Sequence, residues 1–598
     1  DHSLRSTTDT LQISGLGSLD IVNRNFVNVE RIYNQEFNRD WNLLNPTGNQ
    51  QFVTAGIAAS HPRYGTAQYE FQQLSFSENF TGSRHVLRAA LRANKIRSTT
   101  SGSLLSSESD TVKSNFFRIH NATTYSLNNA WIGAKISQED NQINNGDMET
   151  LSPLNQKYQA YEAFIGVGDS TKVYVEGGYQ YRLNDSVRNN TISRVNSRNS
   201  YYLKSKLLNS TASQLSIFVN YQVLKDELGD ALDDQSLNSR ILYNQRLFDG
   251  GIQLNTTLES NNGVIAQQEF TYLKVEPGQG VYTWKDYNNN GVQELDEFEI
   301  AQYQDEAEYV RILLPNQVFL KIRENAFSQI LTLNPQAWVN NEGLFKTLSH
   351  FYNQTSFQLT RKVRRNNDDL LLNPFEDSGD DQLGLTQNFR NALFYNRGKQ
   401  HYTTSYTFLA SSTSNLISLG LQTSKLQSHQ LNFNHKVWES WLITFKGIMG
   451  NTESVSENFE ARNFLLDSYE LNPKLSYLVN QKTRFDVFYT FLNKENTLGE
   501  MELLDQQKIG VSFSHSNAEK ISLSGSFNYI TNDFAGSAFS PVAYQMLEGL
   551  QPGTNFTWNL LLQKKITKYL DANLSYFGRK SKNSSTIHTG NLQLRAFF

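Results

Sequence analysis

Residues 591–598 read Asn591-Leu592-Gln593-Leu594-Arg595-Ala596-Phe597-Phe598. Successive side chains of a β-strand point to opposite faces, so every second residue of this stretch shares a face. One face is apolar and carries Leu592, Leu594, Ala596 and Phe598. The other face carries the polar residues Asn591, Gln593 and Arg595. The stretch therefore predicts a strand with one side against lipid or a hydrophobic core and the other side in water.

The same alternation recurs along most of the chain from about residue 22. Polar residues separate apolar ones in segments such as 173–181, 215–223, 485–491 and 521–529. Asp249-Gly250 predicts a tight hairpin between two further strands. In the strands predicted near residue 598, no charge lies in the middle of the apolar face. Because a Lys or Arg facing lipid there would cost about 2–4 kcal/mol, the pattern indicates strands whose apolar face meets lipid.

The composition narrows the class of protein. The chain has 598 residues and a net charge of −4, so neither sign of charge dominates and nucleic acid is not expected as a partner. No run of about 18 apolar residues occurs, which excludes a membrane-spanning helix. The 29 Tyr and 37 Phe argue against a disordered chain. The absence of cysteine excludes a disulfide framework, a thiolate metal site and a Cys nucleophile.

The predicted connections between strands alternate in length. Those near 566–569, 516–520 and 480–482 are short, whereas those at 532–553 and 494–503 are longer. Outer-membrane β-barrels show this alternation, with short periplasmic turns and longer outer loops. We therefore expect an all-β fold, a large single transmembrane antiparallel β-barrel of roughly 24–28 strands. A closed barrel is favoured because closure removes every free sheet edge.

We expect the barrel to span residues 22–598 and residues 1–21 to form a lead-in segment. The first residues carry no signal-peptide pattern, so we interpret the chain as a mature form or as the C-terminal piece of a longer one. Two other strand-rich architectures are less favoured. A β-solenoid adhesin would show a fixed short repeat, and a string of β-sandwich domains would need Pro- or Gly-rich linkers; we find neither.

One chemical motif interrupts the strands at residues 286–297. It matches D-x-[DN]-x-[DN]-G-x5-E, the calcium loop of an EF-hand, with Gly291 at the sharp turn. The predicted Ca²⁺ ligands are the oxygens of Asp286, Asn288, Asn290, Val292 (through its backbone carbonyl), Glu294 and Glu297. Three carboxylates predict a modest affinity, at about 10⁻⁴–10⁻³ M, which suits a structural ion. The alternative is an Asn- and Gly-rich turn without an ion.

The surroundings of this loop depart from an EF-hand. Residues 276–284 do not have a helical pattern, so the entering helix is missing, whereas residues 298–308 predict one short helix. We therefore treat residues 276–308 as an EF-hand-like insertion within the barrel. The sequence does not fix the side of the membrane on which it lies, outer or periplasmic; we favour the outer side, where long connections are tolerated.

No catalytic motif is present. The sequence has no HExxH, no G-x-S-x-G elbow and no Walker loop, so no catalytic residue, no organic cofactor and no enzymatic activity are predicted. The basic run at residues 361–365, Arg-Lys-Val-Arg-Arg, has two readings. It is either a contact for lipopolysaccharide phosphates or a solvated loop.

The run from Glu276-Pro277-Gly278-Gln279-Gly280-Val281-Tyr282-Thr283-Trp284 through Asp296-Glu297-Phe298-Glu299-Ile300-Ala301 resembles a signature of large outer-membrane barrel proteins of Bacteroidota. Residues 591–598 also resemble the closing strand of bacterial outer-membrane barrels. The resemblance implies a location in the bacterial outer membrane and no catalytic residues. It further implies a barrel that forms the C-terminal half of a longer chain. It identifies no cargo.

The predicted size leads to the functional hypotheses. Porins of about 16–18 strands already hold an aqueous channel, so a larger barrel needs a plug, a partner or a cargo, and no plug domain is predicted. The first hypothesis is a non-catalytic subunit of a protein or lipid export machine or of an outer-membrane assembly machine. Its expected partners are outer-membrane lipid and lipopolysaccharide, other outer-membrane or periplasmic subunits, and surface lipoproteins. The alternatives are a solitary uptake or diffusion channel, and a structural or adhesive surface barrel stabilised by calcium.

Overall fold

The computed structural model describes residues 2–10, 49–76, 80–109, 112–145, 150–152, 155–227, 233–338, 342–365, 373–375, 381–399, 401–417, 420–457, 459–517, 521–567, 569–582 and 584–596. These residues fall into two units. The first is formed mainly by residues up to Ile241 and the second mainly by residues from Leu242 onward. In the described part of the chain, no helix has the length and apolarity that a membrane span requires.

The first unit consists of antiparallel strands that pair with their neighbours in chain order, except that β7 pairs both with the two-residue strand β8 and with β9. They are β1 (His2–Thr10), β2 (Asn49–His61), β3 (Gly65–Phe76), β4 (Phe80–Ala93), β5 (Ile96–Ser109), β6 (Val112–Ser126), β7 (Ala130–Asn145), β8 (Thr150–Leu151), β9 (Gln156–Gly168), β10 (Tyr174–Arg188), β11 (Thr191–Asn209) and β12 (Ser213–Asp226). Strand β13 (Asp234–Leu247) has residues in both units. Residues 2–10 of the predicted lead-in segment are thus strand β1, and residues 11–21 lie outside the described residues.

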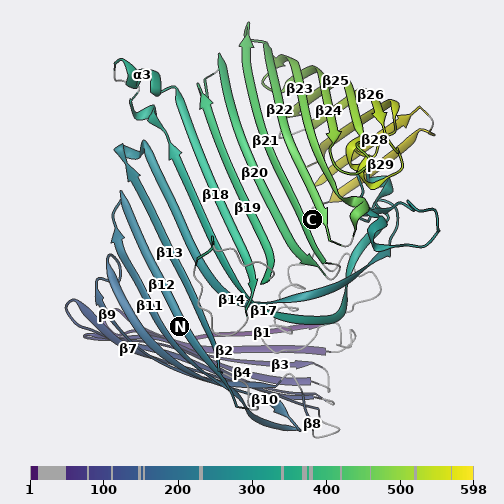
Figure 1. Ribbon diagram of the computed structural model, residues 1–598. Coiled ribbons are helices and arrows are strands. Elements are labelled where there is room, and N and C mark those ends of the chain that lie inside the picture. Colours follow the sequence, from purple (N-terminus) through teal and green to yellow (C-terminus); the bar gives the residue numbers. More distant parts are fainter. Residues whose placement is uncertain are drawn as a thin grey trace. The chain divides into compact units, whose positions relative to one another are not determined.

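The second unit continues the same arrangement (Figure 1). Its strands are β14 (Ile252–Lys274), β15 (Tyr282–Trp284), β16 (Phe298–Ile300), β17 (Tyr309–Leu333), β18 (Phe351–Arg364), β19 (Gln382–Tyr395), β20 (Tyr402–Ile417), β21 (Gly420–Val437), β22 (Trp441–Ser456), β23 (Phe464–Asn480), β24 (Thr483–Asn496), β25 (Leu503–Asn517), β26 (Ile521–Ala535), β27 (Gly553–Thr567), β28 (Leu570–Ser581) and β29 (Ile587–Ala596). Among its described residues, the α-helices are α3 (Leu344–Leu348) and α4 (Pro541–Leu547).

The prediction of an all-β, antiparallel fold is confirmed. The described residues form 29 strands, and three of them (β8, β15 and β16) have only two or three residues. The 26 long strands among the described residues lie within the predicted range of roughly 24–28. Strand β14 begins directly after the turn at Phe248–Gly250, so the predicted hairpin at Asp249-Gly250 is also present.

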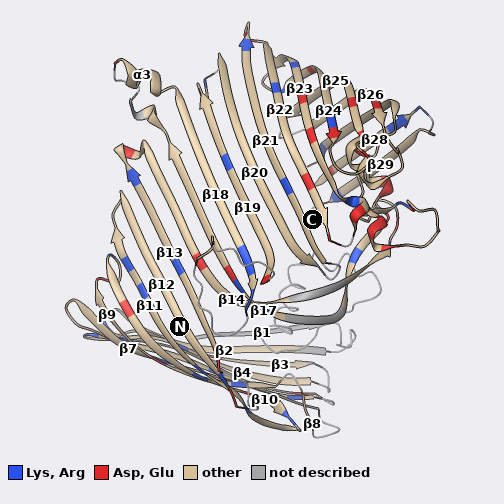
Figure 2. Cartoon of the chain, viewed as in Figure 1, with Lys and Arg blue, Asp and Glu red and all other residues tan. Residues whose placement is uncertain are grey.

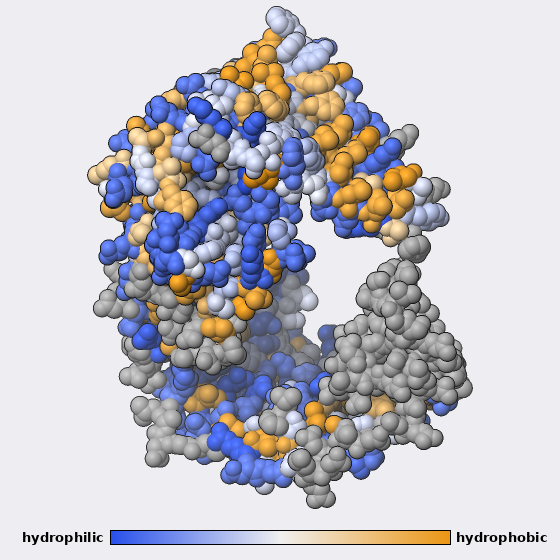
Figure 3. Space-filling view, turned by 90° about the vertical axis from the view of Figure 1, so that its right-hand side faces the viewer, coloured by the Kyte–Doolittle hydropathy of each residue, from blue (hydrophilic) through white to orange (hydrophobic). Residues whose placement is uncertain are grey.

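Strands β24 to β26 of the second unit separate an apolar face from a polar face, as the alternation predicted. Along one register row, Val487, Val511 and Phe527 lie side by side on β24 to β26, with 54%, 47% and 45% of their surface exposed. One residue away, on the other face, lie Asp486, Ser512 and Ser526. Large apolar side chains that stay about half exposed along one face of a sheet are the property of a sheet that faces lipid. Hydrophobic residues gather in patches rather than mixing evenly with hydrophilic ones (Figure 3).

The strand β29 illustrates the same division where the sequence first indicated it. Leu592 and Leu594 pair with Leu574 and Ala572 of β28, and the two leucines are 64% and 60% exposed.

Charged residues are few along β18 to β22 and are concentrated around the connection that follows β14 (Figure 2). Residues 361–364 of the basic run belong to β18, and Lys362 lies 3.7 Å from Glu324 of β17. These residues therefore form part of the sheet and are not a loop.

From β21 to β29 the connections of the second unit alternate in length, as expected. At one end of the strands they are short, at residues 438–440, 481–482, 518–520 and 568–569. Before β21 the alternation is less regular: the connection between β17 and β18 contains α3, the connection 396–401 at the same end is as long as 497–502, and the connection 418–419 at the other end is short. At the other end lie the longer connections 275–308, 457–463, 497–502 and 536–552. The predicted insertion therefore belongs to the end of the sheet that carries the long connections.

Candidate functional site

The insertion, residues 275–308, is a folded segment between β14 and β17. Its short strands β15 and β16 pair with each other as a hairpin, and Tyr282 also pairs with Tyr309 of β17. Phe298 is only 3% exposed; its ring stacks on Tyr272 at a centroid distance of 4.0 Å and meets Tyr309 edge-on at 5.0 Å. Aromatic packing thus fixes the hairpin to the two strands that carry it.

The prediction of one short helix over residues 298–308 is wrong. Residues 298–300 form β16, and only Gln304–Glu306 form a single 3₁₀ turn. The hairpin pairing of β16 with β15 uses the backbone groups that a helix would need, and the burial of Phe298 favours it.

The insertion lies against the polar face of the sheet. Arg579 of β28 forms ion pairs with Asp305, at 2.5 Å, and with Glu306, and its guanidinium lies 4.0 Å from the ring centroid of Tyr303. Arg579 is in register with Thr557 of β27, on the face opposite Trp558. These contacts join residues that are more than 270 positions apart.

A second basic residue holds the hairpin from the connection between β22 and β23. Arg462 donates to the carboxylate of Glu299, at 2.8 Å, and to the backbone carbonyls of Asp296 and Phe298, at 3.4 and 3.2 Å. Glu299 is only 1% exposed. Burial raises the pKa of the Glu299 carboxyl, while the charge of Arg462 and a hydrogen bond from Gln545 oppose that rise. Arg462 therefore compensates a carboxylate that is cut off from water.

The connection 536–552 packs on the same polar face and contacts the insertion. Its helix α4 begins at Ser540, whose hydroxyl accepts a hydrogen bond from Ala543 N, and has Pro541 in its first turn. The buried side of α4 joins residues of β23 and β25 in one hydrophobic cluster of Leu466, Leu504, Val542, Ala543, Met546 and Leu547. Leu466 and Leu504 lie on the polar face, so they form an apolar patch within that face, and α4 covers it.

Hydrogen bonds connect the insertion to α4 directly. Gln302 donates its backbone N–H to the hydroxyl of Tyr544, at 3.1 Å, and Gln545 donates its side-chain amide to Glu299, at 3.2 Å. Burial raises the pKa of Tyr544, and it also raises the pKa of Tyr303 to about 12. Both phenols are therefore neutral hydrogen-bonding groups at ordinary pH. The two connections form one structure, which we call the polar-face assembly: residues 275–308 with residues 536–552.

The six predicted calcium ligands lie together in a turn at the tip of the insertion. Asp286 accepts hydrogen bonds from the backbone N–H groups of Asn290 and Gly291, at 3.1 and 2.9 Å. The side-chain oxygen of Asn290 accepts from Val292 N, at 2.6 Å, and Asn288 donates its amide to Glu294, at 2.6 Å. Gly291 has a φ of +70°, a conformation that favours glycine.

Glu297, at the last position of the loop, is 3% exposed and already bonded. Its carboxylate accepts from the indole N–H of Trp284, at 2.8 Å, and from Tyr287 N, at 3.2 Å. Among the residues that the structure describes, no three His, Asp or Glu side chains converge to hold a metal ion. The donor set consists of oxygen atoms throughout, the chemistry that Ca²⁺ prefers, and each carboxylate oxygen retains a lone pair for a ligand bond.

Sequence reasoning missed Arg462, Arg579 and α4. The helix had a local signal, because Ser540-Pro541 is a helix start and the apolar residues Val542, Ala543, Met546 and Leu547 follow at helical spacing. The arginines had none. Their importance comes from the carboxylates that they meet, which are distant in the sequence.

Comparisons with known proteins add little to this picture. No family model matches the chain, and no curated protein matches it. Solved structures that are similar include the copper transporter OprC, at 8% identity over 86% of this chain and 79% of that one, with a TM-score of 0.31. BauA, the ferric preacinetobactin receptor from Acinetobacter baumannii, shows 10% identity over 89% and 84%, with a TM-score of 0.29. The FrpB iron transporter from Neisseria meningitidis shows 9% over 92% and 80%, with a TM-score of 0.30. Scores of this size carry no argument, so the conclusions below rest on the strands and their contacts.

Proposed function

We propose that this protein is a β-barrel of the bacterial outer membrane that forms an uptake or diffusion channel and catalyses no reaction. Lipid offers no hydrogen bonds, so a sheet that faces lipid must satisfy its backbone groups by closing on itself. The exposed apolar face then meets lipid, and the polar face lines an aqueous lumen. Wide barrels of this kind require a means to limit passage.

The observation that carries the proposal is the place of the polar-face assembly. Arg579, Arg462 and Lys494 hold it on the face that carries Asp486, Ser512 and Ser526, and Lys494 does so by an ion pair with Glu548, at 3.1 Å. A folded segment on this face narrows the water path from within. The prediction that the chain has no internal plug is therefore replaced by a proposal that two connections act as a constriction.

A subunit of an export or assembly machine was the first hypothesis from the sequence, and nothing in the structure or the comparisons supports it. Its partners (lipopolysaccharide, other outer-membrane or periplasmic subunits, and surface lipoproteins) remain predictions. The adhesive barrel also remains a prediction. A constriction on the lumen face is a feature of a channel, which is the reason for our choice.

The test is single-channel conductance of the full chain in planar bilayers, after a heat-dependent mobility shift has shown that it is folded. We expect discrete conductance steps, and larger steps in the variant R462M/R579M, which releases the assembly. A matched control, K446M, removes a basic residue of the polar face that does not contact the assembly; its partner Glu470 lies 3.5 Å away. Folded protein that inserts but passes no current in either form would overturn the proposal.

We further propose that the loop at residues 286–297 binds one structural Ca²⁺ through Asp286, Asn288, Asn290, the Val292 carbonyl, Glu294 and Glu297. The ion would replace hydrogen bonds within the loop by ligand bonds and would stiffen the tip of the insertion. Its modest predicted affinity suits the outer surface, the side on which we place the loop.

The calcium prediction can be tested by proteolysis of the insertion. Millimolar Ca²⁺ should protect residues 276–308 from cleavage in the wild type, and E297Q should lose that protection. The control E308Q changes a carboxylate of the same insertion, paired with Lys274 at 3.2 Å and outside the loop. Equal cleavage of the wild type with Ca²⁺ and with chelator would contradict the prediction.

A further inference from the structure

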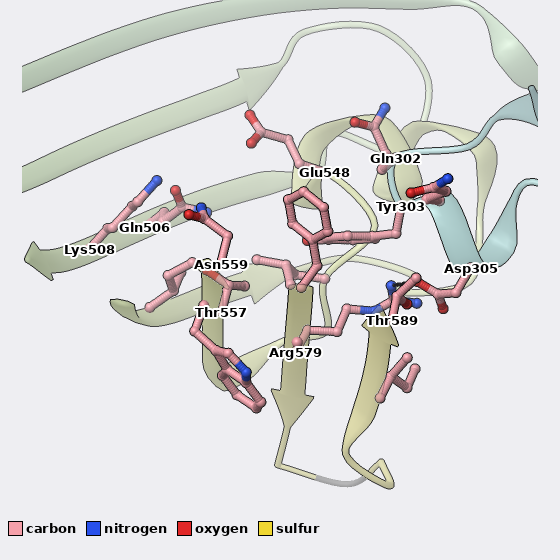
Figure 4. Close-up of a pocket in the computed structure, with 17 residues that line it drawn as sticks. Gln302, Tyr303, Asp305, Gln506, Lys508, Glu548, Thr557, Asn559, Arg579 and Thr589 are labelled. Atoms are coloured by element: carbon pink, nitrogen blue, oxygen red, sulfur yellow. Dashed lines mark hydrogen bonds and ion pairs between the residues drawn. The ribbon is translucent and has the colours of Figure 1, made fainter. Parts of the chain in front are cut away.

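A cavity lies between the polar-face assembly and the wall of the second unit. Its volume is about 430 Å³, within the usual range of small-molecule pockets, about 300–1,000 Å³. Residues 302–305 of the insertion and Glu548 and Leu550 after α4 close one side. Strands β25 to β29 form the other side, mainly through residues of their polar face such as Thr557, Asn559 and Arg579 (Figure 4).

The apolar part of this cavity breaks the pattern of the polar face. Phe577 takes the position on β28 between Ser575 and Arg579, where the alternation calls for a polar side chain, and yet it is 41% exposed. Ile530 and Leu550, which are 4% and 8% exposed, complete an apolar wall together with the ring of Tyr303. An aromatic ring that is exposed on a polar face contributes no hydrophobic burial energy there. A ligand that covers the ring would supply that energy.

The charges of the cavity leave one cation without a carboxylate. Arg579 and Lys285 together balance Asp305 and Glu306, because Arg579 pairs with both carboxylates and Lys285 lies 3.3 Å from Glu306; Glu548 is paired with Lys494. Lys508 of β25 also lines the cavity, and no ion pair involves it among the residues that the structure describes. Its ammonium group lies 5.9 Å from the ring centroid of Phe488. The net charge presented to a ligand is therefore that of Lys508.

We propose that this cavity binds a small amphiphilic anion with an aromatic or aliphatic body and one carboxylate or similar group. The apolar body lies on Phe577 and Tyr303, and the anionic group meets Lys508. Thr557, Asn559 and Thr589 at the rim supply neutral hydrogen-bonding groups. The inference deepens the proposed function, because it names the class of solute that the constriction selects.

The experiment measures binding of 2-naphthoate to the detergent-solubilised full chain by calorimetry in a nonionic maltoside at low salt. Its uncharged analogue 2-naphthamide is titrated in parallel. We expect naphthoate to bind at least tenfold more tightly than the amide. K508Q should abolish this preference and leave amide binding unchanged, and F577S should weaken both ligands at least tenfold. K446Q, outside the cavity, should behave as the wild type.

Equal affinity for the two probes in the wild type, or naphthoate binding that K508Q leaves intact, would overturn the proposal. The same holds if the folded wild type binds neither probe. Each variant is checked by its heat-dependent mobility shift, and K508Q tests the charge even if F577S fails to fold. Because binding is measured without a membrane, a protein that binds naphthoate but conducts no ions would refute the channel alone. A conducting protein that binds neither probe would refute only this site.

Discussion

Glu299 is the residue on which the attachment of the insertion to the neighbouring connections depends most directly. It is almost fully buried, and its compensation comes from Arg462 and Gln545, which belong to two different connections. A buried carboxylate without its partner is far less stable than either a paired carboxylate or a neutral side chain. One ion pair therefore links three segments of the chain.

Arg462→Met should release the insertion. The substitution keeps much of the side-chain volume but leaves Glu299 uncompensated, at a cost of about 3–5 kcal/mol. Limited proteolysis of residues 276–308 at pH 7 should become at least tenfold faster. The control Lys274→Met removes an exposed pair worth about 0–1 kcal/mol and should change little. Equal protection in wild type and R462M would show that the pair does not hold the insertion.

The raised pKa of Glu299 predicts how this attachment depends on pH. Because burial raises the pKa of the folded state above that of the exposed carboxyl, the docked insertion binds the proton more tightly than the released one. The stabilisation is complete below the ordinary Glu pKa and is lost as the pH rises through the raised value. In the presence of chelator, proteolysis of residues 276–308 should therefore be slower at pH 5.5 than at pH 7.5. Glu299→Gln, which is neutral throughout, should remove the difference.

At the scale of the strands, glycines provide room for aromatic rings of the neighbouring strand. A Cβ on Gly510 of β25 would lie 2.2 Å from Phe488, and one on Gly166 of β9 would lie 2.2 Å from Trp131. Gly578 stands in the same relation to Trp558. A ring that lies over a glycine covers backbone that would otherwise be open. Each pair of a glycine and an aromatic residue on the adjacent strand therefore fixes the position of the aromatic ring on the sheet.

Gly510→Ala should destabilise the protein by about 1–3 kcal/mol, because the new methyl group forces the Phe488 ring from its place. Gly590→Ala in β29 is the matched control, since nothing lies within 4 Å of its Cβ position. We expect the temperature of the mobility shift to fall in G510A and to stay the same or rise slightly in G590A. A fall of equal size in both would attribute the effect to the backbone and not to the ring.

For the whole molecule, the decisive relation is that between the sheet and its solvent. In the second unit the apolar face runs from β24 to β26 along one register row, and Val487, Val511 and Phe527 on it remain about half exposed. In water such a surface would cause aggregation. In a bilayer the same apolar side chains contact lipid tails, which are equally apolar. The membrane is thus part of what stabilises the fold.

Val487→Arg on the apolar face should cost about 2–4 kcal/mol for a side chain near the bilayer midplane. Ser524→Arg on the polar face of β26 should be tolerated, since an arginine there contacts water. The yield of folded protein in lipid vesicles, read from the heat-dependent mobility shift, distinguishes them. If V487R folds as well as S524R, the apolar face does not meet lipid.

The sequence by itself determined the strands, the two faces and the alternation of short and long connections. It could do so because these features are local: a strand repeats every two residues, and Leu592, Val487 and Phe527 show their face by their neighbours alone. The oxygen-rich loop at residues 286–297 is readable for the same reason, although its ion remains a prediction.

Only the tertiary structure decided where the connections lie. Asp305 meets Arg579, Glu299 meets Arg462, and α4 packs on Leu466 and Leu504, and each partner is distant in the chain. No periodicity encodes such pairings, because a charge in a loop looks the same whether it is solvated or buried against an opposite charge. The place of the insertion on the polar face, and the cavity beneath it, follow from burial energies that exist only once the sheet has brought these residues together.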